Sequence, residues 1–134
     1  MAEGHQETLR RWFEAQNRED FDAAIAMVHP EIVFVPPGGQ PAYRGATRVR
    51  RWMEPDALHG QVIEAQESEL GADGTVLMKV RVTARGASSG IELDTVSWCV
   101  SRFDEQGRIA RFEIFLEHEE DKAREAAGLS ERTG

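Results

Sequence analysis

The sequence predicts an α+β fold in which helices pack on one face of a strongly bent antiparallel sheet. Two observations support this prediction. The first part of the chain carries apolar residues at helical spacing, and the second part carries β-branched and aromatic residues that alternate with polar ones. Short turn-like breaks separate the strand-like segments, and short connections favour antiparallel neighbours.

The length and composition favour one domain. The chain has 134 residues, of which 40% are hydrophobic and 30% are charged. Domains of roughly 100–150 residues are the commonest size and bury enough surface to be stable. We therefore expect a single domain over residues 1–134, with its core at about 6–129.

Two helices are expected before the first strand. The first run of residues at helical spacing comprises Leu9, Trp12, Phe13 and Gln16. The second run follows an acidic start at Glu19 and Asp20 and comprises Phe21, Ala24, Ile25 and Val28. A tight turn is expected to join the two helices.

A short strand and a third helix come next. The strand is expected at Glu31–Val35, and it ends in the proline- and glycine-rich segment PPGGQP. A helix then opens at "YRG" and carries Val49, Trp52 and Met53 on one side. It must end near Pro55, because the residue before a proline avoids helical geometry.

The rest of the chain is expected to form four strands and a final helix. The strand-like segments are residues 62–70, 75–84, 91–103 and 108–116. The breaks between them read GADG, RGASSG and DEQG, which favour turns. The last helix begins in acidic residues after Leu116 and is expected to end at a glycine cap, Gly128.

The charge and the hydropathy exclude several partners. The net charge of −8 repels phosphate backbones, so a nucleic-acid partner is not expected. No apolar run approaches the roughly 18–20 residues of a membrane span, and the first residues lack the features of a signal peptide. The sequence therefore predicts a cytoplasmic protein that does not enter membranes.

Neither a metal site nor a cofactor site is predicted. The single cysteine, Cys99, allows no internal disulfide and cannot alone hold a structural zinc ion. The four histidines form no HxH or HExxH pattern. Cys99 is best interpreted as a small apolar residue of a strand.

The order of these elements resembles a known superfamily. The sequence "HPEIVFVPPG", the following "YRG", and the closing "RFDEQGRIARFEIF" are similar to the nuclear transport factor 2-like superfamily, which includes SnoaL-like polyketide cyclases, ketosteroid isomerases and limonene epoxide hydrolase. Arg102–Ile109 resembles the hairpin before the last strand of steroid isomerases, and "AREAAGL" is found in SnoaL-like members. The resemblance implies a sheet curled into a cone around a central pocket, whose mouth the segment PPGGQP would frame.

The catalytic residues of two family members are not carried over. In the steroid isomerases the resemblance places the two donors and the base at Trp12, Cys99 and Val35, and none of these side chains suits its role. For limonene epoxide hydrolase it places apolar residues at the Arg and Asp positions: Val80, Val82 and Ile114. Arg81 could substitute only if a bulge shifts the strand phase, and it is expected to point outward.

Three carboxylates are the candidate catalytic residues. Glu117 lies close to an acid that SnoaL-like proteins commonly have at the end of the last strand, and Glu113 lies in the same strand. Asp94 pairs with Glu92 on one strand face, where two carboxylates can split their pKa values. In the alternative interpretation, Glu117 is a first-turn acid, Glu113 is solvated, and the Glu92–Asp94 pair lies on the outer face.

The predicted function is binding of a small hydrophobic molecule, with or without weak acid/base catalysis. The expected pocket residues are Trp12, Val35, Tyr43, Trp52, Met78, Val80, Thr95, Ser97, Cys99 and Ile114. One alternative is a cyclase, isomerase or epoxide hydrolase-type enzyme with a non-standard carboxylate. A second alternative is a structural interaction module, which a cone without a cavity would favour.

The strand at 91–103 also predicts self-association. Val96, Trp98 and Val100 form a second apolar face of this strand, which helices on the opposite face cannot cover. An exposed apolar patch usually marks an interface, and symmetric dimers are the commonest way to bury one. We therefore expect a homodimer through the sheet, with Trp98 near its centre.

Overall fold

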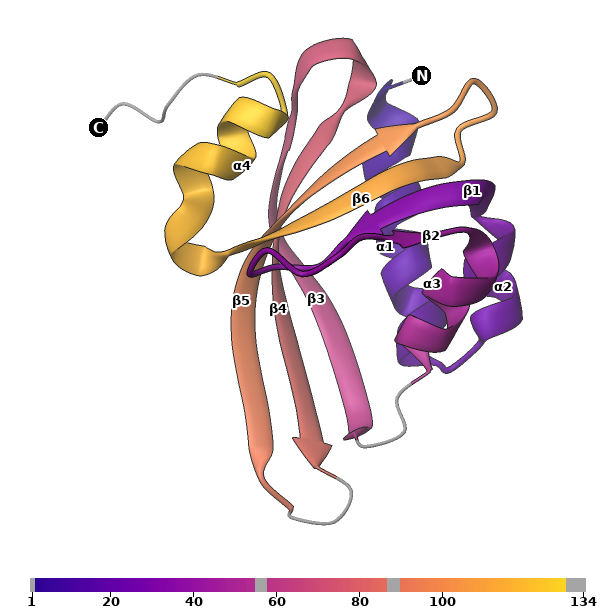
Figure 1. Ribbon diagram of the computed structural model, residues 1–134, viewed down its shortest axis with the longest axis vertical. Helices are drawn as coiled ribbons and strands as arrows, with labels where there is room; N and C mark the ends of the chain where they lie inside the picture. Colours follow the sequence, from indigo (N-terminus) through magenta and orange to yellow (C-terminus); the bar gives the residue numbers. More distant parts are fainter. Residues whose placement is uncertain (1, 55–57, 87–89, 130–134) are drawn as a thin grey trace.

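The computed structural model describes residues 2–54, 58–86 and 90–129, and its helices and strands follow one another as drawn in Figure 1. The helical elements are α1 (Ala2–Asn17), α2 (Phe21–Ala26), α3 (Ala46–Met53), η1 (Ala72–Gly74), η2 (Glu117–Glu119) and α4 (Glu120–Ala126). The strands are β1 (Val28–Val35), β2 (Tyr43–Arg44), β3 (Leu58–Leu70), β4 (Val76–Gly86), β5 (Glu92–Phe103) and β6 (Ile109–Leu116).

The strands form one six-stranded sheet in the order β2-β1-β6-β5-β4-β3. Strands β3 to β6 make the predicted antiparallel meander. Strand β1 pairs with β6 in parallel, so the sheet is mixed rather than antiparallel throughout. The α+β class is confirmed. Short connections could not predict the pairing of β1 with β6, because the whole meander separates these two strands in the chain.

Strand β1 starts earlier than the sequence predicted. Val28, which the helical spacing assigned to the second helix, is the first residue of β1, and α2 already ends at Ala26. Pro30 explains the difference, since it cannot continue a helix and is tolerated at irregular strand positions. The pairing of β1 with β6 shifts register between Val28 and Val33, which accommodates it. The two-residue strand β2, predicted as the start of a helix, pairs with Val33 and Phe34.

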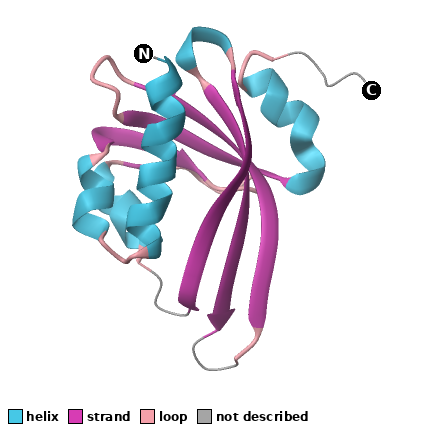
Figure 2. Cartoon of the chain, turned by 180° about the vertical axis from the view of Figure 1, so that it is seen from behind, coloured by secondary structure: helices cyan, strands magenta, loops and turns pink. Residues whose placement is uncertain are grey.

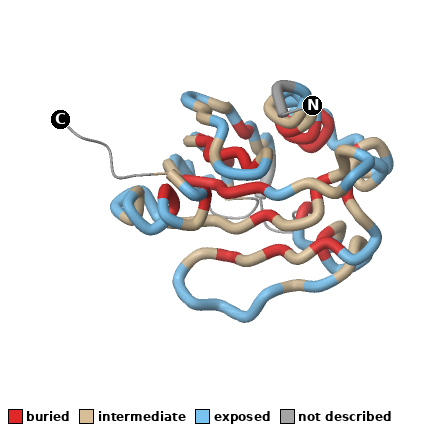
Figure 3. The backbone as a smooth tube through the Cα atoms, turned by 90° about the horizontal axis from the view of Figure 1, so that it is seen from above, coloured by how far each residue is buried: buried red, intermediate tan, exposed pale blue. Residues whose placement is uncertain are grey.

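Helices cover both faces of the sheet, which corrects the prediction of one covered face. Helices α1, α2 and α3 lie on the concave side and α4 lies on the other, as the two opposite views show (Figures 1 and 2). Accordingly there are two hydrophobic clusters, a large one around Trp12 and Phe34 and a small one around Trp98 and Ala123. Buried residues include Leu9 and Trp12 of α1 and Val76, Leu77 and Met78 of β4; such segments are drawn in red in Figure 3.

Trp98 is buried, so the exposed patch expected around it is wrong. Its side chain is 3% exposed and belongs to one hydrophobic cluster with Ala123 of α4 and Ala127, the residue that follows α4. Its indole Nε1 donates a hydrogen bond to the carbonyl oxygen of Glu117 at 3.2 Å, and Lys79 Nζ lies 5.4 Å from the ring centroid. Helix α4, rather than a second subunit, therefore covers the apolar face around Trp98. The homodimer itself stays a prediction, without Trp98 at its centre.

A backbone hydrogen bond and an ion pair connect the end of α4 to the region where β3 turns into β4. The backbone N–H of Ala72 donates to the carbonyl oxygen of Ala127 at 2.9 Å. Arg124, which is 6% exposed, forms an ion pair with Glu69 at 2.5 Å. Gly128 follows with a φ of +74°, the left-handed conformation expected of a glycine cap. These contacts hold α4 against the sheet.

Candidate functional site

A cavity of about 280 Å³ lies between the concave face of the sheet and helices α1 and α3. Helices α1 and α3, strand β1 and the loop after it contribute Trp12, Phe13, Gln16, Phe34, Pro37 and Trp52 to its lining. The meander contributes Gln61, Ile63, Val80, Val82, Ala84, Leu93, Thr95, Ser97, Cys99, Phe112 and Ile114. The volume is close to the lower end of the roughly 300–1,000 Å³ range of small-molecule sites.

Strand alternation builds the sheet side of this cavity. Successive side chains of a strand point to opposite faces, so Thr95, Ser97 and Cys99 of β5 share the concave face. In the antiparallel register, Val80 lies opposite Ser97, and Cys99 lies opposite Ile114. Three neighbouring strands therefore send small or aliphatic side chains to the same place and leave space between the sheet and α1.

Aromatic side chains from helices α1 and α3 and from strands β1 and β6 form another part of the cavity wall. The ring of Trp12 meets Phe112 edge-on, with centroids 5.0 Å apart, and Phe34 lies 5.4 Å from Phe112. Trp52 of α3 stacks at a tilt on Phe34, with centroids 4.3 Å apart, and is 40% exposed. Trp12 thus belongs to the closed end of the cavity, and Trp52 belongs to its mouth.

The lining holds no ionisable acid or base other than the thiol of Cys99, as far as the described residues are concerned. Burial raises the pKa of the Cys99 thiol, so this group stays protonated and neutral. The other polar side chains are the amides of Gln16 and Gln61 and the hydroxyls of Thr95 and Ser97. The indole Nε1 of Trp12 is buried and has no hydrogen-bond partner in the described part of the chain.

Seven of the ten predicted pocket residues line the cavity: Trp12, Trp52, Val80, Thr95, Ser97, Cys99 and Ile114. The other three do not. Phe34 occupies the position expected for Val35, because the inward residues of β1 are Ile32 and Phe34, both 0% exposed. Met78 points to the concave side but is enclosed in the hydrophobic cluster beyond the cavity. Tyr43 packs against Phe34, with ring centroids 6.4 Å apart.

The candidate catalytic carboxylates do not face the cavity. Asp94 accepts two hydrogen bonds from Arg81 on the outer face, and the hydrogen bond from this guanidinium lowers the pKa of Asp94. Glu113 lies opposite Val100, on the outer phase of β5, and pairs with Arg111 at 3.4 Å. The interpretation of Arg81 and Asp94 as outward residues agrees with this geometry.

Glu117 lies at the start of η2 and is exposed. Its backbone carbonyl accepts the hydrogen bond from Trp98, on the side of the sheet that α4 covers. The first-turn interpretation of Glu117 therefore describes its position, and the structure does not bring it together with Asp94 or Glu113.

Several lining residues were not assigned to the pocket from sequence. Phe13 and Gln16 share the buried side of α1 with Trp12, so their helical spacing could have identified them. Phe112 and Ile114 are two residues apart in β6, so their side chains share a face. Gln61 and Ile63 carry no comparable signal, because the β3–β4 register shifts between His59 and Val62 and again between Ala65 and Glu67.

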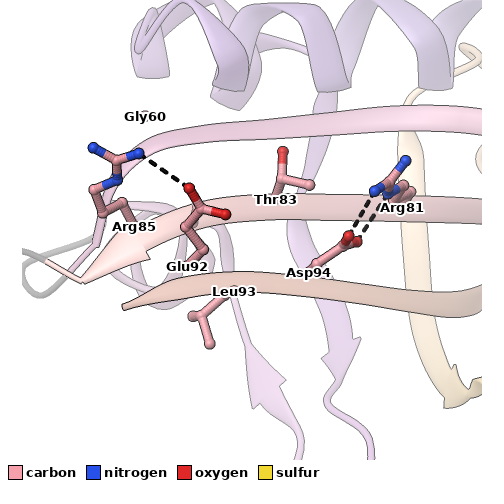
Figure 4. A pocket seen from close by; sticks show the side chains of 8 residues that line it. Gly60, Arg81, Thr83, Arg85, Glu92, Leu93 and Asp94 are labelled. Carbon is pink, nitrogen blue, oxygen red and sulfur yellow. Dashed lines mark hydrogen bonds and ion pairs between the residues drawn. The ribbon is translucent and has the colours of Figure 1, made fainter. Parts of the chain in front are cut away.

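A second hollow lies on the outer face of the sheet and measures about 540 Å³ (Figure 4). Its polar lining consists of Arg81, Thr83, Arg85, Glu92 and Asp94. The two arginines already face acids across it, with Arg81–Asp94 at 2.5 Å and Arg85–Glu92 at 3.2 Å. These charges are exposed and paired with one another, so they would contribute little free energy to binding a ligand. The smaller central cavity is therefore the candidate site.

The described residues provide neither a metal cluster nor a membrane span. No three His, Cys, Asp or Glu side chains in residues 2–54, 58–86 and 90–129 are grouped so that they could hold a metal ion. None of the described helices has the length and apolar composition that crossing a membrane requires.

Comparison with known proteins gives one family and many similar folds. Residues 9–112 match the family described as SnoaL-like domain. Comparison with curated proteins gave no match. The matched residues begin at Leu9 in α1 and end at Phe112, which lines the cavity, so they include most of the site.

One similar solved structure is SalBIII, an epoxide hydrolase/cyclase-like enzyme described for pyran ring formation in polyether salinomycin. It superimposes with a TM-score of 0.78 at 19% identity, over 86% of this chain and 93% of that chain. RV0760c from Mycobacterium tuberculosis, in complex with estradiol-17β-hemisuccinate, gives a TM-score of 0.73 at 11% identity, over 81% and 90%. An NTF2-like protein from Exiguobacterium sp. 255-15 gives 0.70 at 18% identity, over 80% and 95%. At these identities the similarity shows the fold.

Proposed function

This chain belongs to the family of SnoaL-like domains, and on that premise we propose that it binds a small, largely hydrophobic molecule in its central cavity. The observation that carries the proposal is the cavity of about 280 Å³ with aromatic and aliphatic walls. A pocket with apolar walls and a few polar groups is typical of small-molecule sites. The cavity also argues against a purely structural module, for which a filled cone would suffice.

Known structures with this fold are compatible with the proposal. RV0760c was solved in complex with estradiol-17β-hemisuccinate, and SalBIII is described as an epoxide hydrolase/cyclase-like enzyme. We take from them only that a protein with this fold can bind a small organic molecule. The substrate class of this chain has to follow from its own lining.

Acid/base catalysis is not part of the proposal. A cyclase, isomerase or epoxide hydrolase-type reaction needs a group that moves a proton at the bound molecule. Asp94 and Glu113 are paired with arginines on the outer face, and Glu117 is exposed at η2. Cys99 does line the cavity, but its raised pKa keeps the thiol from acting as a base.

Filling the cavity should weaken ligand binding. We expect Ser97→Phe to weaken the binding of small apolar ligands such as indane by more than about tenfold, because the new ring occupies the space of the ligand. Ser97 is half-buried and lines the cavity. Titration calorimetry gives the affinity, and the ligand-induced rise in melting temperature gives an independent readout.

The matched control is Val96→Phe, the neighbouring position on the opposite face of β5. Val96 is also half-buried but does not line the cavity, so this variant should bind like the wild type. Equal affinity of the wild type and Ser97→Phe for ligands that do bind would show that the ligand sits elsewhere.

A further inference from the structure

Four neighbouring strands carry a row of arginines on the outer face of the sheet. Arg44 of β2 lies opposite Val33 of β1, which lies beside Arg111 of β6. Arg111 in turn lies opposite Arg102 of β5. Residues in register share one face of a sheet, so Arg44, Arg111 and Arg102 form a single row, which we call the arginine row. Phe112, the residue after Arg111, lines the central cavity, so the row lies on the opposite face.

Few acidic side chains neutralise this row. Like charges directly opposite each other on a sheet are destabilising, and Arg102 and Arg111 are such a pair. Arg111 pairs with Glu113 at 3.4 Å, whereas Arg44 and Arg102 are exposed and form no ion pair with any described residue. Glu31, on the same face of β1, is exposed and pairs with none of the three arginines. The row therefore keeps an excess of positive charge that a partner of opposite charge would offset.

A hollow of about 270 Å³ lies beside two of these arginines. Its lining comprises Val100, Arg102, Arg111, Glu113 and Ala126. Ala126 is the last residue of α4, so the hollow lies between this helix and the outer face of β5 and β6. A guanidinium group binds a carboxylate through paired hydrogen bonds, and the apolar side chains beside it can pack against the chain that carries the acid.

We propose that the arginine row binds an extended acidic segment of a partner protein. Neighbouring strands are about 4.8 Å apart, so the row spans about 14 Å from β2 to β5. One phosphate or carboxylate cannot reach across this distance. An extended chain with an acid at every second residue can, because it presents carboxylates about 7 Å apart along one side.

The charge of the molecule also favours this partner over a second copy of the chain. The net charge is −8, so the row is a local exception at which an acidic segment is attracted rather than repelled. Two copies joined symmetrically with the row at their centre would bring like charges together. The inference goes beyond the proposed function and uses no residue that lines the central cavity.

The probe is a fluorescein-labelled peptide of alternating glutamate and serine, and a peptide of alternating glutamine and serine is its neutral counterpart. Fluorescence anisotropy at low ionic strength gives the dissociation constants. We expect the wild type to bind the glutamate peptide about tenfold more tightly than the glutamine peptide, the combined effect of several exposed ion pairs. Arg102→Gln and Arg44→Gln should each weaken this binding about threefold. Glu113→Gln should strengthen it, because it removes the acid that competes for Arg111.

The control is Arg10→Gln, which makes the same change of charge at an exposed arginine of α1, on the other side of the sheet. It measures the effect of net charge alone and should weaken binding less than Arg102→Gln does. If Arg102→Gln and Arg44→Gln bind the glutamate peptide as Arg10→Gln does, the inference is overturned. The affinity for indane should be the same in all these variants, so failure of the cavity as a binding site and failure of this inference are distinguishable.

Two other occupants of the row would give different results. A loss in Arg102→Gln without any loss in Arg44→Gln, together with displacement of the peptide by inorganic phosphate, would show a site for a single anion. A smaller mass of Arg102→Gln than of the wild type in light scattering would assign the row to a contact between copies of the chain. Either result would overturn the inference.

Discussion

Trp98→Glu is expected to lower the free energy of unfolding by about 4 kcal/mol or more, because it removes a large buried ring and puts a carboxylate in its place. Trp98 is 3% exposed and is the largest side chain of the cluster that joins α4 to the sheet. The hydrogen bond to Glu117 and the cation–π contact with Lys79 are lost with the ring. Urea denaturation followed by circular dichroism measures the change.

The matched control for Trp98→Glu is Val62→Glu, which puts the same charge at an apolar residue of the sheet that is 46% exposed. It should change the stability by less than about 1 kcal/mol. A Trp98→Glu variant as stable as the wild type, and monomeric where the wild type is dimeric, would instead support the interface first inferred from the strand pattern.

Gly71→Ala is expected to destabilise the protein by about 2 kcal/mol, the usual range for forcing an extra group into packed structure. A Cβ atom at Gly71 would lie 2.0 Å from the backbone oxygen of Ala127, and a backbone atom cannot move away as a side chain can. The end of α4 would have to shift, and its hydrogen bond from Ala72 would be strained. Thermal unfolding measures the loss.

Gly4→Ala makes the same substitution in α1, where the added Cβ meets no described atom within 4 Å beyond its chain neighbours and the adjacent helix backbone. Alanine is the better helix former, so this control should be neutral or slightly stabilising. If Gly71→Ala unfolds at the same temperature as Gly4→Ala, α4 does not pack on the β3–β4 turn as described.

Local patterns predicted the meander and most of the sheet side of the cavity. Alternation along β4 and β5 places Val80, Thr95 and Ser97 on one face, and a side-chain period of two leaves no other arrangement once one face is buried. Helical spacing on α1 likewise indicated the buried side that carries Trp12. These inferences need only the residues of one element, which explains why they could be made from sequence.

The errors arose where distant segments decide the outcome. Nothing in β5 alone shows that α4, about twenty residues later, covers Trp98, and the apolar outer face was therefore assigned to a second subunit. The choice between Phe34 and Val35 depends on which phase of β1 faces Phe112 of β6. Gln61 and Ile63 reach the cavity through a strand with two register shifts, which a regular alternation cannot predict.

The central cavity as the binding site is tested most directly by a crystal structure of the protein grown with saturating indane. We predict density for one molecule enclosed by Trp12, Val80 and Phe112. Density in the outer hollow beside Arg81 and Asp94, or a central cavity that stays empty at saturation, would contradict the assignment.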